Sequence, residues 1–145
     1  MGGLGWGVGA AIGAKLAAPD RLVIATLGDG AYMFGTPTAG HQAARTMGLP
    51  VLVSVFNNSM WEEVEGSSLR VFPDGYAARS NRMPVGNLGP TARYEHMMGI
   101  YGGYGECVES ADALPGALER AIHAVTVEKR QALLNLIVGP RGAAP

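Results

Sequence analysis

Two stretches decide the fold of this chain: LVIATLGDG at residues 22–30 and VLVSVFNN at residues 51–58. Each begins with a run that is almost entirely apolar, which is typical of a strand covered on both faces of a parallel sheet. The segment Thr36–Met47, which a Gly-Leu-Pro stop signal follows, is interpreted as a helix. The sequence therefore predicts a strand–helix–strand unit whose strands are Leu22–Leu27 and Val51–Phe56.

The alternation of strand and helix continues along the rest of the chain. Further helices are predicted at Gly5–Ala18, Pro90–Tyr101 and Asp112–Lys129, and further strands at Tyr104–Val108 and Ala132–Val138. Residues 61–65 are interpreted as the start of a helix, whereas residues 66–89 are predicted to be irregular because of their turn signals. This order predicts one α/β domain over residues 1–145, a three-layer α/β/α fold with a mainly parallel sheet. Because no strand precedes the first glycine-rich helix, we expect the domain to lack its first strand–helix unit.

The composition excludes several classes of function. A net charge of −1 over 145 residues gives no long-range attraction to nucleic acid or to an anionic membrane. The single cysteine, Cys107, cannot form an internal disulfide and fits a reducing compartment. Residues 1–18 are apolar but lack a basic segment before the apolar stretch, so no signal peptide is predicted and a cytoplasmic location is expected. Glycine, 22 of the 145 residues, is about twice as frequent as usual, which indicates close approach of a ligand to the backbone.

Polar side chains directly follow the two central strands. Asp29 comes after the first strand and Asn58 after the second, and a right-handed βαβ unit brings both to the same edge of the sheet. A carboxylate and a carboxamide oxygen suit Mg²⁺, which completes its octahedral shell with phosphate oxygens and water. The glycines that flank Asp29, Gly28 and Gly30, let backbone N–H groups approach a phosphate. The sequence therefore predicts a site for a metal ion and a diphosphate.

The motif GDG, a spacer of residues 31–56, and NN resembles the thiamine-diphosphate motif of the family that includes acetolactate synthase, benzoylformate decarboxylase and pyruvate decarboxylase. The segments GGLG at residues 2–5 and AAIG at residues 10–13 resemble the run that precedes GDG in that family. The resemblance covers nearly the whole chain and implies a diphosphate-binding domain that uses thiamine diphosphate and Mg²⁺. The implied reaction makes or breaks a carbon–carbon bond next to a carbonyl, usually on a small-molecule 2-oxo acid.

The resemblance also implies roles for individual residues. The side chains of Asp29 and Asn58 and the backbone carbonyl of Met60 correspond to the metal ligands. The remaining implied cofactor-binding residues are the diphosphate contacts Gly28, Gly30, Ala31 and Trp61, the glycines Gly2 and Gly3, and Leu4. Of these, Gly2 would accept the aminopyrimidine's amino group through its carbonyl, and Leu4 would hold the cofactor in its bent shape.

Two positions depart from the family pattern. Ala31 replaces a serine that often follows GDG, so only its backbone N–H can contact the diphosphate. The acidic residue of some decarboxylases falls on Val64, so we expect that acid to be missing here. The neighbouring Glu62, Glu63 and Glu65 are interpreted as a solvated helix face.

The other polar candidates are given structural roles. His41, His96 and His123 fall in or beside predicted helices and are expected to pack or to face solvent. Cys107 is expected to be a small core residue rather than a nucleophile. No residue of this chain is assigned a catalytic role.

In the resembled family, the glutamate that activates the cofactor lies in a separate pyrimidine-binding domain, usually of a neighbouring subunit. We therefore expect the isolated chain to be inactive, and to form a homo-oligomer or to pair with a pyrimidine-binding domain. Two alternatives remain open: a non-catalytic fragment or subunit that binds cofactor or dimerises, and a nucleotide-binding α/β domain of another kind.

Overall fold

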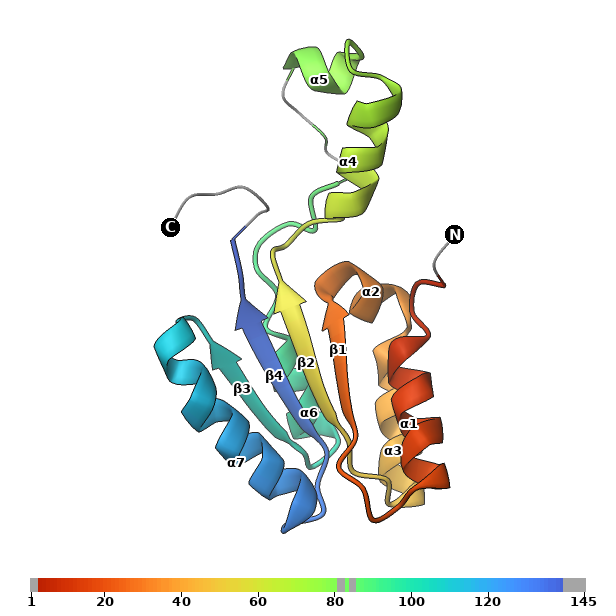
Figure 1. Ribbon diagram of the computed structural model, residues 1–145, viewed down its shortest axis with the longest axis vertical. Coiled ribbons are helices and arrows are strands. Elements are labelled where there is room, and N and C mark those ends of the chain that lie inside the picture. The colour runs from red at the N-terminus through yellow and green to blue at the C-terminus, as the bar shows by residue number, and fades with distance from the viewer. Residues whose placement is uncertain (1–2, 81–82, 84–85, 140–145) are drawn as a thin grey trace.

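The computed structural model describes residues 3–80, 83 and 86–139. Its four strands form one sheet in the order β1-β2-β4-β3, and every neighbouring pair is parallel (Figure 1). The strands are β1 (Ile24–Gly28), β2 (Leu52–Asn57), β3 (Tyr104–Val108) and β4 (Ala132–Ile137). Gly28 is in register with Phe56, and Asn57 with Ile137, so β1, β2 and β4 end at one edge. The predicted α/β fold with a parallel sheet is confirmed.

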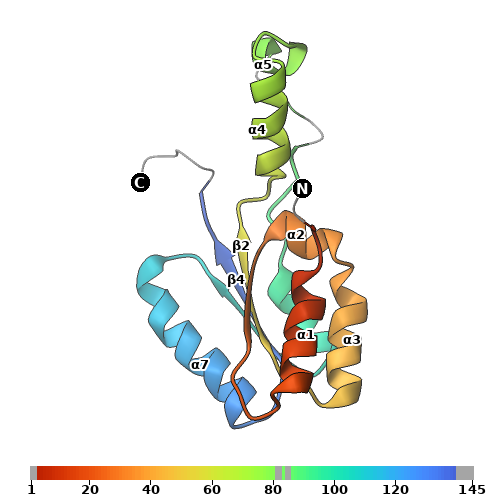
Figure 2. The ribbon, with the colours of Figure 1, turned by 45° about the vertical axis from the view of Figure 1, so that its right-hand side comes forward.

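Helices cover both faces of the sheet. The long helix α7 (Leu114–Thr126) packs on β2, β3 and β4, while the glycine-rich helix α1 (Gly7–Ala17) packs on β1 from the opposite side (Figure 2). The side of α1 also carries four further elements: α2 (Asp29–Phe34), α3 (Pro37–Met47), the 3-10 turn η1 (Tyr94–His96) and α6 (Met97–Ile100). A further 3-10 turn, η2 (Ala111–Ala113), precedes α7.

The core lies in two layers because neighbouring residues of a strand face opposite sides of the sheet. On β4, Leu133 belongs to the apolar cluster under α1 and α2, whereas Leu134 belongs to the cluster under α7. On β2, Val53 belongs to the cluster under α1 and α2, and Leu52 belongs to the cluster under α7. The three-layer arrangement therefore follows from strands that are apolar on both faces.

The prediction of irregular structure for residues 66–89 is wrong in its first half. Helix α4 (Glu62–Val71) continues past residue 65, and a second helix, α5 (Tyr76–Ser80), follows the turn. Acidic residues in the first turn of α4 and Arg70 in its last turn complement the helix dipole. We call residues 62–80 the arm; it projects beyond the carboxyl edge of the sheet, and none of its helical residues, all of which are described, is buried (Figure 1).

Other element boundaries also differ from the prediction. The helix expected at Pro90–Tyr101 begins only at Tyr94, and the helix expected at Asp112–Lys129 is regular only from Leu114 to Thr126. The six-residue helix α2 was not predicted, because the segment is too short to show a helical repeat of apolar residues. Among the described residues, no helix combines the length and apolar character needed to cross a membrane.

Candidate functional site

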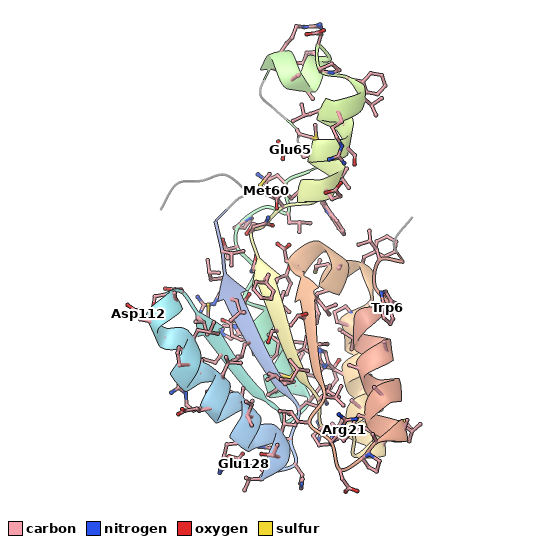
Figure 3. The ribbon with its side chains drawn as sticks, in the orientation of Figure 1. Trp6, Arg21, Met60, Glu65, Asp112 and Glu128 are labelled. Carbon is pink, nitrogen blue, oxygen red and sulfur yellow. The ribbon has the colours of Figure 1, made fainter. Side chains whose placement is uncertain are left out.

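The candidate site lies at the carboxyl edge of the sheet, between the strand ends and the base of the arm. Figure 3 shows Met60 above the end of β2, where the chain turns into α4. A cavity of about 420 Å³ opens here. Its wall includes eight of the predicted site residues: Leu4, Gly28, Asp29, Gly30, Ala31, Asn58, Met60 and Trp61. The fold thus brings together three segments that are well separated in the sequence: Leu4, residues 28–31 and residues 58–61.

Asp29 is the buried carboxylate of this cavity, with 2% of its surface exposed. Its Oδ1 accepts a hydrogen bond from the N–H of Gly30 at 2.9 Å, whereas its Oδ2 is buried without a hydrogen-bond partner among the described residues. Burial raises the pKa of Asp29, and the backbone N–H groups of Gly30, Ser59 and Met60 oppose that shift. A buried carboxylate oxygen without a partner is costly, and a cation would satisfy it. This donor therefore fits a metal ion.

Asn58 is oriented by hydrogen bonds at both ends of its carboxamide. Its Nδ2 donates to Glu62 Oε2 at 2.9 Å, and its Oδ1 accepts from the N–H of Met60 at 3.1 Å. Only the oxygen can face a backbone N–H and only the nitrogen can face a carboxylate, so the two contacts agree on one orientation. Oδ1, the atom that could bind a metal, therefore points towards the backbone N–H of Met60 in the loop after β2.

The two glycines of the GDG motif differ in what surrounds them. A β-carbon built on Gly28 would meet nothing within 4 Å, which leaves room for a ligand beside its backbone. A β-carbon built on Gly30 would lie 2.6 Å from Trp61 Cε3. Trp61 lines the cavity, but its backbone N–H already donates to the carbonyl of Gly86 at 2.7 Å.

The segment before α1 contributes Leu4 and one of the two remaining predicted residues, Gly3. Leu4 lines the main cavity with half of its surface exposed. Gly3 lines an adjoining cavity of about 610 Å³, whose wall also includes Leu4 and Ala31. Gly2 lies outside the described residues.

Glu62 is a site residue that the sequence interpretation missed. The interpretation of its carboxylate as part of a solvated face is wrong, because Glu62 lines the cavity and accepts the hydrogen bond from Asn58. Its position four residues after Asn58, at the start of a helix, was the only signal in the sequence. Val64, where some family members carry an acid, lines the same cavity with an apolar side chain.

The three histidines lie away from this cavity. His41 is fully buried between Tyr32 Oη, 2.8 Å from its Nε2, and Gln131 Oε1, 2.9 Å from its Nδ1, and burial lowers its pKa. His96 and His123 are exposed beside Glu95 and Glu128. The expectation of packing and surface roles is confirmed.

Cys107 was expected to be a core residue. It is only half-buried on β3, an edge strand, so that expectation is wrong in degree. Burial is still sufficient to raise the pKa of its thiol, which disfavours the nucleophilic thiolate form.

Comparison with protein-family models matches residues 1–135 to the family described as "Thiamine pyrophosphate enzyme, C-terminal TPP binding domain". A 2-hydroxyacyl-CoA lyase of Oryza sativa subsp. japonica is 34% identical over 144 residues, covering 99% of this chain and 23% of the lyase. The acetolactate synthase large subunit of Mycobacterium tuberculosis is 32% identical over 149 residues, covering 100% of this chain and 24% of the synthase.

Among solved structures, the thiamine diphosphate-dependent 4-hydroxybenzoylformate decarboxylase of Rhodococcus jostii RHA1 is similar with a TM-score of 0.76. The two proteins are 27% identical, and the match covers 94% of this chain and 23% of the decarboxylase. The chain therefore spans about a quarter of the length of the relatives that it matches.

Proposed function

The chain belongs to the family of thiamine pyrophosphate enzymes, as their C-terminal TPP-binding domain, and on that premise we propose that it holds thiamine diphosphate through Mg²⁺ at the Asp29 cavity. The bound cofactor supplies an electron sink for making or breaking a carbon–carbon bond next to a carbonyl. The part of this chain is to anchor the diphosphate end of the cofactor.

The observation that carries the metal assignment is the buried Asp29 Oδ2, which has no hydrogen-bond partner among the described residues. A diphosphate placed beside this carboxylate would face a like charge in a poorly solvated site, which is strongly unfavourable. A divalent cation between them reverses the sign of the interaction. Asn58 Oδ1 and the carbonyl of Met60 are the further oxygens that the loop offers to Mg²⁺.

The contacts to the cofactor itself fall to backbone groups and one apolar side chain. Gly28, Gly30 and Ala31 line the cavity. The backbone N–H groups of Gly28 and Ala31 would contact the diphosphate, whereas the N–H of Gly30 already donates to Asp29 Oδ1. Leu4 would support the middle of the cofactor, where an apolar wall is needed. Trp61 is assigned mainly to support Gly30, since the backbone N–H of Trp61 already donates to the carbonyl of Gly86.

Two substrate classes are consistent with this site. Small 2-oxo acids are our first proposal, because the resemblance to acetolactate synthase covers the whole chain. The second is a 2-hydroxyacyl thioester, which is favoured by two plant relatives named 2-hydroxyacyl-CoA lyase, at 34% and 31% identity over 99% of this chain. Carbon–carbon bond turnover by the whole enzyme with pyruvate, or with a 2-hydroxyacyl-CoA, distinguishes the two.

The metal assignment is tested by titrating the protein with thiamine diphosphate in a calorimeter, with Mg²⁺ and with EDTA. We expect binding that requires Mg²⁺ and that is lost in Asp29→Ala, which removes the only carboxylate assigned to the metal. Equal affinity of both proteins under both conditions would overturn the assignment.

A further inference from the structure

Three buried amide and carboxylate side chains lie directly behind the loop that carries Asn58 and Met60. Asn57, Asn135 and Glu95, which we call the amide network, have 1%, 0% and 5% of their surface exposed. They come from the end of β2, from β4 and from η1. Polar groups as deeply buried as these persist only when their hydrogen bonds are satisfied, so their partners show what the network holds.

Asn57 uses its whole hydrogen-bonding capacity. Its Nδ2 donates to Asn135 Oδ1 and to the carbonyl of Ala92, both at 3.0 Å. Its Oδ1 accepts from the N–H of Ser59 at 3.1 Å and from the Ser59 hydroxyl at 3.3 Å. A carboxamide offers two N–H groups and two lone pairs, so its position is fixed from four directions.

The network continues from Asn57 to the surface. Asn135 Nδ2 donates to Glu95 Oε2 at 2.7 Å and to the carbonyl of Ala92 at 2.9 Å. Glu95 in turn accepts from Arg93 Nε at 2.5 Å. Bonds to a charged carboxylate are stronger than those between neutral groups, so Asn135 is itself held firmly.

The carboxamide oxygen of Asn57 faces the loop that carries Asn58 and Met60. Ser59 has a φ of 58°, a left-handed conformation that residues other than glycine rarely adopt, and Asn57 Oδ1 receives its N–H. Asp29, Asn58 and Met60 line one cavity, and Ser59 lies between the last two in the chain. The separation between Asp29 and the loop therefore depends on where Asn57 holds Ser59.

We propose that Asn57 is a positioning residue for the cation site. Asn135 and Glu95 hold Asn57 in place, and Asn57 holds the loop so that Asn58 and Met60 keep their separation from Asp29. The inference rests on the proposed function, and it gives a role to the first asparagine of the NN pair. Mg²⁺ requires a nearly ideal octahedron, whereas Ca²⁺ accepts longer and more varied distances. A loop held rigidly by the amide network therefore selects Mg²⁺ over Ca²⁺.

The test loosens the network at Asn135, whose hydrogen bonds go to Asn57, Ala92 and Glu95 and not to the assigned metal ligands. Thiamine diphosphate binding is titrated calorimetrically in Asn135→Leu, and in Asn135→Ser as the milder change, with Mg²⁺ and separately with Ca²⁺ as the varied cation. We expect the Mg²⁺ concentration for half-maximal binding to rise about tenfold or more, the usual effect of losing a partner behind a metal ligand. The Ca²⁺ midpoint should move much less, so that the preference for Mg²⁺ shrinks.

A control variant separates positioning from general loosening. Lys15→Met removes a part-buried hydrogen bond from Lys15 Nζ to the carbonyl of Arg21, at the end of the molecule opposite the site (Figure 3). It should lower thermal stability without changing the preference.

The outcomes distinguish this inference from the proposed function. An unaltered protein that binds no thiamine diphosphate with Mg²⁺ would overturn the proposed function, and the positioning role with it. Normal binding by the unaltered protein, together with an unchanged cation preference in both Asn135 variants, would overturn the positioning role alone. A preference that shrinks equally in Lys15→Met would also overturn it.

Discussion

The indole of Trp61 lies against the α-carbon of Gly30 so closely that no side chain fits between them. A β-carbon on Gly30 would stand 2.6 Å from Trp61 Cε3 and 2.9 Å from Cζ3. The ring of Trp61 also meets Phe34 edge-on, and the backbone N–H of Trp61 donates to the carbonyl of Gly86. The second glycine of the GDG motif is therefore required by packing as well as by any ligand.

Gly30→Ala should displace Trp61 and narrow the cavity. We expect a loss of about 1–3 kcal/mol in the free energy of unfolding, as for other overpacked sites, and weaker binding of thiamine diphosphate. Urea denaturation and calorimetry measure the two effects. Gly13→Ala in α1, where the added carbon meets nothing within 4 Å, is the control and should raise stability by up to about 1 kcal/mol. Unchanged stability and affinity in Gly30→Ala would show that Trp61 moves freely.

The buried carboxylate of Asp29 should destabilise the protein without cofactor at neutral pH. Because burial raises the pKa of Asp29 above its ordinary 3.8, the folded state holds the proton at pH values where the unfolded chain has released it. The free energy of unfolding therefore falls as the pH rises from 3.8 through the raised pKa. Asp29→Asn should melt at a higher temperature than the unaltered protein at pH 7, and the difference should narrow towards pH 4. A lower melting temperature at pH 7 would contradict this reading.

His41 should make the protein sensitive to acid in a different range. Burial lowers the pKa of His41 below its ordinary 6.5. Below pH 6.5 the unfolded chain therefore binds a proton at this histidine that the folded state does not bind, and the free energy of unfolding falls as the pH falls. His41→Gln should cost about 1–3 kcal/mol at pH 8, because the bonds to Tyr32 and Gln131 are disturbed, and the deficit should shrink at pH 5. Thermal melts at both pH values check this. The exposed His123→Gln should show neither effect.

We also expect the chain to associate, either with itself or with a pyrimidine-binding partner. β1 is an edge strand, Ile24 on it is 45% exposed, and Trp6 at the start of α1 is 70% exposed. Open strand edges and apolar patches recruit partners. Light scattering over a concentration series should give a mass above one chain, and Ile24→Lys should lower it, whereas Val127→Lys at the end of α7 should not. A mass fixed at one chain would refute self-association.

The 145-residue chain assayed by itself should show no carbon–carbon bond turnover. The resemblance assigns the activating glutamate to another domain, and the chain spans about a quarter of its relatives. Purified chain with Mg²⁺, thiamine diphosphate and pyruvate or benzoylformate is the assay. Turnover on the ordinary enzymatic scale, roughly 1–10³ per second, would mean that this chain supplies its own activating group.

The sheet could be predicted from the sequence because three of its strands, β1, β2 and β4, belong to mostly apolar runs with clear ends. Leu133 and Leu134 face opposite layers, so both had to be apolar, and that leaves an unambiguous local signal. The GDG and NN motifs were equally local. The assignments of Asp29, Asn58 and Met60 as metal ligands stay predictions, although the fold brings all three to one cavity.

The parts that could not be predicted have no local signal. The arm buries none of its helical side chains, so the end of α4 shows no clear apolar repeat, and its turn residues suggested an irregular segment instead. The contacts of Asn57 with Asn135, and of Asn135 with Glu95, join residues 78 and 40 positions apart. Hydrogen bonds between such distant positions depend on the order of strands in the sheet, which one sequence does not reveal.

The strand order also makes the arm a natural place to divide the polypeptide. The arm separates β2 from β3 and β4 along the chain, yet β2 pairs with β4 from Leu52–Ala132 to Asn57–Ile137 in the middle of the sheet. A protease could cut between Arg70 and Arg79, because the helices α4 and α5 contain no buried residue. The two pieces would stay associated through the pairing of β2 with β4. The domain could thus be supplied as two complementing halves, of which the first carries β1 and β2, the strands that end at Asp29 and Asn58, and the second carries β3 and β4.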